Sequence, residues 1–248
     1  MFAVFLAGIA AGTVNTVVGS GTLITFPTLL AFGVPPVTAN VSNTIGLVPG
    51  SISGAIGYRR ELAGQRGRVI RLAGASLLGG VAGAVLLLAL PDDAFNTIVP
   101  ALIGLGCVLV IFQPAIGRKV AARADSRAEP AEHGAGWVWV LVLLAGVYGG
   151  YFGAAQGVLL MAIMGIGIKE SLQRLNGTKN VLAGLVNGVA ALIFMVVADV
   201  DWTVVALIAG GSVIGGQLGA SVGRRLPPLA LRIFIVVVGV VAVVSLLA

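Results

Sequence analysis

Long apolar runs alternate with short polar segments along the whole chain, and the lengths of the runs give the first prediction. A helix needs about 20 apolar residues to cross a bilayer. Six runs have this length and carry no Asp or Glu, so each predicts one transmembrane helix. These runs cover roughly residues 40–58, 71–90, 95–113, 180–198, 202–222 and 232–248.

Two further apolar stretches, 2–34 and 137–167, are about 30 residues long and contain glycine breaks. They are too long for one ordinary crossing. Each has the length of two half-helices that enter and leave the membrane on the same side. We therefore expect two broken, re-entrant hairpins in addition to the six crossing helices.

The chain contains an internal repeat at an offset of 136 residues. Between 72–86 and 208–222, seven of fifteen ungapped positions are identical, and Leu90-Pro91 recurs in register as Leu226-Pro227. Small-residue packing between helices would by itself produce some similarity. The identities and the preserved register favour duplication, so we predict two repeats, 1–113 and 137–248, each with one hairpin and three helices.

Charge predicts how the repeats are oriented. The fifteen Lys and Arg residues fall into four clusters, whereas the loops at 91–96 and 199–201 are acidic. If both hairpins are re-entrant, every basic cluster lies on the cytoplasmic side, as the positive-inside rule requires. Each repeat then crosses three times, so the two repeats are inverted and both termini lie outside. Inverted repeats with broken helices are a recurrent design of secondary transporters.

Composition supports a multi-pass protein of the cell membrane. Hydrophobic residues make up 58% of the chain, charged residues make up 10%, and the mean hydropathy is +1.08. The net charge of +6 is spread over short clusters between apolar runs, so we expect no nucleic acid partner. The polar stretch 114–136 is expected to be a cytoplasmic linker between the repeats. A homo-oligomer is left open.

The breaks are candidate anion sites. A helix end exposes up to four N–H groups, which hydrocarbon cannot satisfy. Free N–H groups at a helix N-terminus attract anions, helped by the helix dipole. Two such ends that face each other would enclose a small anion at the midplane of the bilayer. The candidate residues at the breaks are Asn15, Gly19, Ser20, Gly21 and Thr22 in the first repeat and Gln156 and Gly157 in the second.

A polar cluster follows each break and supplies further candidates. Such clusters would serve equally as simple helix caps, but they recur in both repeats and hold more polar groups than one cap needs. Lys179 stands opposite Asn43 in the repeat, and it either lines the cavity or faces the cytoplasm. The clusters are Asn40, Ser42, Asn43 and Thr44, and Asn176, Thr178, Lys179 and Asn180.

Other functional classes lack support in the sequence. It shows no metal-ligand cluster, no nucleotide phosphate-binding loop and no nucleophile with a plausible base, so we expect neither an enzyme nor a cofactor. An anion that leaves a cell with a negative interior gains about 2.3 kcal/mol per charge per 100 mV. Uniport is therefore favoured over proton coupling.

The chain carries, in this order, the stretches NTVVGSGTLITFPTLL, VPPVTANVSNT, GYRREL, YGGYFGAAQGVLL and LNGTKNVL. In these stretches it resembles the sulfite exporter TauE/SafE family of bacterial membrane permeases. It implies transport, as export, of small oxyanions such as sulfite, sulfonates or related organic anions. The alternatives are a passive anion channel and a membrane scaffold or assembly protein without transport activity.

Overall fold

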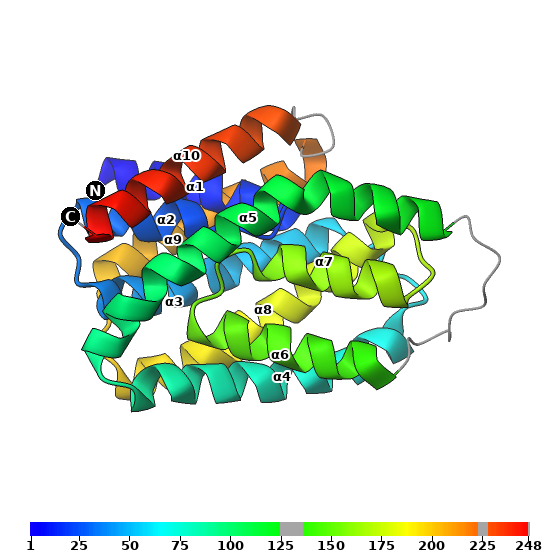
Figure 1. Cartoon of the computed structure of the whole chain (residues 1–248), viewed down its shortest axis with the longest axis horizontal. Coiled ribbons are helices and arrows are strands. Elements are labelled where there is room, and N and C mark those ends of the chain that lie inside the picture. Colours follow the sequence, from blue (N-terminus) through cyan, green and yellow to red (C-terminus); the bar gives the residue numbers. More distant parts are fainter. Residues whose placement is uncertain (125–135, 223–227, 248) are drawn as a thin grey trace.

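The computed structural model describes residues 1–124, 136–222 and 228–247, and these residues form helices and short connections without any strand (Figure 1). The expected all-α membrane fold is confirmed. The helices are α1 Phe2–Val17, α2 Thr22–Ala31, α3 Pro36–Gly57, α4 Arg66–Ala89, α5 Asp92–Ala124, α6 Gly136–Tyr151, α7 Gln156–Gly167, α8 Leu172–Val197, α9 Trp202–Val222 and α10 Pro228–Leu247.

Both of the longer apolar stretches are broken into two helices. The α1–α2 break contains Gly19 at φ +89°, and the α6–α7 break contains Gly153 at φ +76° and Ala155 at φ 61°. These left-handed conformations cannot continue a right-handed helix. In Figure 1 the α1–α2 hairpin begins and ends at the end of the bundle near the N-terminus, and the α6–α7 hairpin opens at the opposite end.

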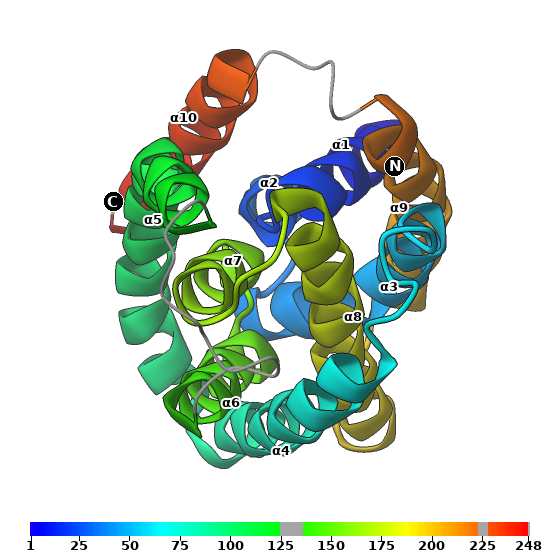
Figure 2. The same ribbon diagram turned by 90° about the vertical axis from the view of Figure 1, so that its right-hand side faces the viewer.

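The three helices that follow each hairpin start at the same offset in the two halves. Pro36 and Leu172, Arg66 and Trp202, and Asp92 and Pro228 are each 136 positions apart. The packing is exchanged between the halves: α1 packs on α9 as α6 packs on α4, and α2 packs on α10 as α7 packs on α5. Figure 2 shows α2 and α7 towards the centre of the molecule, with longer helices around them.

Small residues allow the exchanged helices to pack with their backbones close together. A Cβ atom at Gly79 of α4 would lie 2.2 Å from the Leu143 carbonyl oxygen of α6. The corresponding Cβ at Gly215 of α9 would lie 2.1 Å from the Ile9 carbonyl oxygen of α1. No side chain fits at either distance, so the repeated glycines hold each hairpin against a helix of the other half.

Four of the six expected crossings are helices that are long and apolar enough to span a membrane: Arg66–Ala89, Asp92–Ala115, Leu172–Val197 and Trp202–Ser221. The fifth, α3, has 22 residues but carries the polar cluster at 40–44. In the sixth, α10, the described apolar segment is Arg232–Val244, which is shorter than the four spanning helices.

The boundaries expected around the polar segments need correction. Helices α3 and α8 begin at Pro36 and Leu172, before the polar clusters rather than at them. The expected linker 114–136 begins inside α5, which continues to Ala124 because Ala, Arg and Lys favour the helix there. The rest of that segment, 125–135, lies outside the described residues.

Candidate functional site

The two breaks meet at the centre of the bundle. The Gly157 N–H, in the first turn of α7, donates to the Gly19 carbonyl oxygen at 3.0 Å. A Cβ atom built on either glycine would lie 2.4 Å from the Cα atom of the other. Only two residues without side chains can come this close, so glycine at both positions lets the hairpins touch.

The first break leaves backbone donors unpaired. Among the described residues, no acceptor takes the N–H groups of Ser20, Gly21 and Thr22, whereas Leu23 N–H already donates to the Ser20 carbonyl oxygen at 3.2 Å. Ser20 Oγ and Gln156 Nε2 are buried and also lack a partner there. Unsatisfied buried polar groups are costly. This concentration of donors at the start of α2 and α7 is the chemistry that an anion satisfies.

Lys179 lies beside the meeting point and is fully buried, with 0% of its surface exposed. Its ammonium Nζ donates to the carbonyl oxygens of Asn15 and Thr16, each at 3.0 Å. These carbonyls belong to the last turn of α1, where the helix dipole favours a cation. The interpretation of Lys179 as a loop lysine facing the cytoplasm is therefore wrong.

The polar clusters cap the broken helices of the opposite half. Asn176 Nδ2 and Asn180 Nδ2 donate to the Thr16 carbonyl oxygen at 3.2 and 3.3 Å. In the other direction, Asn40 Nδ2 donates to the Tyr151 carbonyl oxygen at the end of α6, at 2.9 Å. Since Asn40 and Asn176 are 136 positions apart, the two halves use the same device.

The clusters do not cap the N-termini of their own helices. The N-cap of α3 is Pro35, which makes no side-chain cap bond. The N-cap of α8 is Ser171, whose Oγ accepts from Arg174 N–H at 3.4 Å. The alternative that these clusters are simple N-caps is therefore wrong, because each cluster begins at the fifth residue of its helix.

The remaining predicted residues do not all face the meeting point. Asn43 holds α2 by a 3.3 Å bond to Thr22 Oγ1 and a short bond from Thr25 Oγ1. Ser42 Oγ instead accepts from the Asp201 N–H in the loop before α9, at 2.9 Å. Asn15 Nδ2 reaches Ser51 Oγ at 3.5 Å. Thr44 is buried, and the described residues offer its side chain no hydrogen bond.

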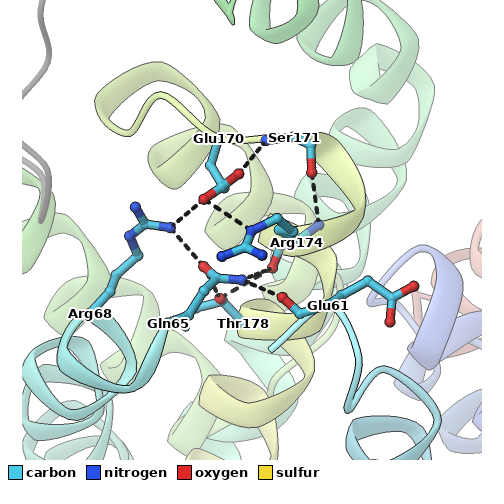
Figure 3. A network of polar contacts seen from close by, with 7 residues as sticks. All are labelled: Glu61, Gln65, Arg68, Glu170, Ser171, Arg174 and Thr178. Atoms are coloured by element: carbon cyan, nitrogen blue, oxygen red, sulfur yellow. Dashed lines mark hydrogen bonds and ion pairs between the residues drawn. The ribbon is translucent and has the colours of Figure 1, made fainter. Parts of the chain in front are cut away.

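Thr178 points into a network that sequence reasoning missed (Figure 3). Its Oγ1 lies 3.3 Å from Gln65 Oε1, and Gln65 Nε2 donates to the Arg174 carbonyl oxygen at 3.2 Å. Glu170 pairs with Arg68 and Arg174, both at 3.1 Å. The spacing of Glu170 and Arg174 is that of a helical ion pair, but no sequence signal links this pair to Arg68.

Comparison with known proteins identifies the family. The family model described as "Sulfite exporter TauE/SafE" matches residues 4–246. The chain belongs to the TauE/SafE family. "Probable membrane transporter protein ORF9" of Sinorhizobium sp is 27% identical over 249 residues, covering 98% of this chain and 91% of that protein. "Probable membrane transporter protein YfcA" of Escherichia coli strain K12 is 25% identical over 251 residues, covering 98% and 88%.

A third relative, "Probable membrane transporter protein YdhB" of Bacillus subtilis strain 168, is 25% identical over 232 residues, covering 92% of this chain and 91% of the relative. No solved structure matches the chain. This TauE/SafE protein is thus a membrane transporter by family. Its centre combines a buried ammonium, unpaired N–H groups and uncharged amides. The ammonium and the unpaired N–H groups are groups that can bind a small anion.

Proposed function

We propose that this protein is a secondary transporter that exports small oxyanions, such as sulfite or a sulfonate, through a site at the junction of the two breaks. The observation that carries the proposal is Lys179. A buried ion normally has a partner of opposite charge. Within the described structure Lys179 makes no ion pair, and its hydrogen bonds go to two carbonyls. The transported anion is then the counter-ion.

The donors around Lys179 support an oxyanion in particular. Sulfite and sulfonates present several oxygen atoms, each of which accepts hydrogen bonds. Ser20, Gly21 and Thr22 offer three consecutive N–H groups without an acceptor in the described structure. Ser20 Oγ and Gln156 Nε2 add two buried groups without a partner in the described structure. Candidate residues at the junction also include Gly19 and Gly157. Their contact sets how closely the N–H groups of the first break approach Gln156 in the second.

The arrangement of the helices supports alternating access. The hairpins open at opposite ends of the bundle, and the helix contacts are exchanged between the halves (Figure 1). We propose that the halves are inverted in the bilayer, with the connection 58–65 and the segment 168–171 on the cytoplasmic side. Rocking one half against the other would then expose Lys179 first to one side and then to the other. The membrane potential favours export of an anion.

Uptake of radiolabelled sulfite into inverted vesicles tests the proposal. Vesicles that contain the protein should take up sulfite faster than protein-free vesicles, with a rate that saturates as sulfite concentration rises. A rate that never saturates would indicate a channel. Uptake equal to that of protein-free vesicles, for sulfite and for several sulfonates, would support a scaffold without transport activity and refute the proposal.

A further inference from the structure

A second cluster of charged groups lies where α4 and α8 begin (Figure 3). Here one carboxylate, that of Glu170, is held by three donors. Arg68 Nη1 and Arg174 Nε each lie 3.1 Å from Glu170 Oε2, and the Ser171 N–H donates to Oε1 at 3.0 Å. Arg68 belongs to α4 of the first half, so the carboxylate joins the two halves.

This donor set has the character of an oxyanion site. Guanidinium groups match the geometry of carboxylate and related oxyanions, and here two of them hold one carboxylate oxygen. The side chains of Arg68, Glu170 and Arg174 are 11%, 19% and 35% exposed. An anion at this end of the bundle can therefore reach the arginines without first crossing the apolar core.

We propose that Arg68 and Arg174 form a first binding site for the transported oxyanion at this end of the bundle, which we call the vestibular site. The Glu170 carboxylate is a built-in competitor that the incoming anion displaces. This inference rests on the proposed function, because it assigns a first binding step to the same substrate class. The carboxylate keeps the arginine pair neutralised in part while no substrate is present. The substrate then takes the place of the Glu170 carboxylate beside the two arginines.

A chain of hydrogen bonds links the vestibular site to the centre. Arg68 Nη1 donates to Gln65 Oε1 at 2.6 Å, and Thr178 Oγ1 lies 3.3 Å from the same oxygen. Gln65 is 2% exposed, and Thr178 directly precedes Lys179. Displacing Glu170 from Arg68 breaks the ion pair between the halves and shifts Arg68, whose Nη1 also donates to Gln65. Anion exchange at the vestibular site thereby disturbs the hydrogen bonds of Gln65 and Thr178, the residues that link this site to Lys179.

The test measures thermal unfolding of the purified full-length protein against sulfite concentration. All variants carry Lys179→Gln, which removes the central cation and leaves the vestibule as the site that is probed. Adding Glu170→Gln should lower the sulfite concentration for half-maximal stabilisation at least about tenfold, because the internal competitor is gone. Adding Arg174→Gln to that double variant should reverse the gain. Asp93→Asn, the same charge change on an exposed residue of α5, should leave the concentration unchanged.

An equal half-maximal concentration with and without Glu170→Gln would overturn the proposal. So would equal stabilisation by chloride at matched ionic strength, because that indicates charge screening alone. If Glu170→Gln does not fold, phenylglyoxal modification of wild-type protein gives a second measurement. Methanesulfonate, a sulfonate that does not add to the aldehyde of phenylglyoxal as sulfite does, should slow the modification of Arg174, and an unchanged rate refutes the vestibular site.

The two proposals fail in different ways. Saturable sulfite uptake by wild-type protein, combined with no effect of Glu170→Gln in the binding assay, preserves the transport function and removes the vestibular site. Sulfite binding that depends on Arg174, combined with uptake no faster than in protein-free vesicles, keeps the vestibular site and removes transport of sulfite.

Discussion

Lys179 and Thr16 join the two halves of the protein: the Lys179 ammonium donates to the Thr16 carbonyl oxygen at 3.0 Å, across 163 positions of sequence. The same carbonyl accepts from Asn176 and Asn180. A break in a membrane helix is stable only if other groups satisfy its freed carbonyls. Here the groups that donate to the Thr16 carbonyl come from the opposite half. The end of α1 and the position of the Lys179 ammonium therefore depend on each other.

Replacing Lys179 should abolish high-affinity anion binding. Lys179→Gln keeps hydrogen bonding to the Asn15 and Thr16 carbonyls but removes the charge. Hydrogen bonds to a charged group contribute about 1.5–3 kcal/mol, so the apparent affinity for sulfite should fall about 10- to 100-fold. Initial rates of sulfite uptake into vesicles, measured over a range of sulfite concentrations, give the apparent affinity. Lys169→Gln, which neutralises an exposed lysine before α8, is the matched control, and an equal loss in both variants would show that Lys179 has no special role.

Adding a methyl group at Gly157 should separate the two breaks. In Gly157→Ala the new Cβ would lie 2.4 Å from Gly19 Cα and 3.0 Å from Lys179 Cδ. Because the first contact is with backbone, we expect destabilisation of about 1–3 kcal/mol together with loss of transport. Thermal unfolding in detergent measures the first effect. Gly188→Ala in α8, where no atom lies within 4 Å of the new Cβ, should behave as wild type.

The two asparagine caps should differ in importance. Asn40 supplies a donor to the Tyr151 carbonyl oxygen, whereas Asn176 shares the Thr16 carbonyl with Lys179 and Asn180. Asn40→Ala should therefore cost about 1–3 kcal/mol of stability, the penalty for an unsatisfied buried group, and Asn176→Ala should cost less. Chemical denaturation of both variants makes the comparison, with Asn96→Ala on the exposed surface of α5 as control. The reverse ranking would contradict the capping roles.

The Glu170 network should weaken in acid. Burial alone would raise the pKa of Glu170, but hydrogen bonds from Ser171, Arg68 and Arg174 outweigh it and hold the pKa below its usual value. A depressed carboxylate pKa stabilises the folded state fully above the ordinary glutamate pKa of about 4.3, and this contribution is lost as pH falls through the lowered value. Unfolding temperatures measured from pH 6 to about pH 3 should thus fall more steeply for wild type than for Glu170→Gln. Parallel curves would argue against the ion pairs.

The lengths of the apolar runs were sufficient to predict the helical elements, because run length is a local property of the sequence. Apolar run lengths identify the long helices, and Gly19 marks where the first hairpin breaks. The second break lies at Gly153, before the predicted Gln156-Gly157, which already belong to α7. The internal repeat could be detected from the sequence because its small residues face a neighbouring helix in both halves. Helix limits were less accurate, since Asn40 and Asn176 lie inside helices where polar side chains suggest a boundary.

What the sequence determined by itself is that the chain is a helical membrane protein with two repeated, broken hairpins. The tertiary structure decided which groups satisfy the breaks: Lys179 and Asn176 reach α1, and Asn40 reaches α6. It also decided that Arg68 meets Glu170. These partners lie more than 100 positions apart in sequence. Composition and spacing carry no information about such pairs, because only the packing of the two halves brings them within hydrogen-bond distance.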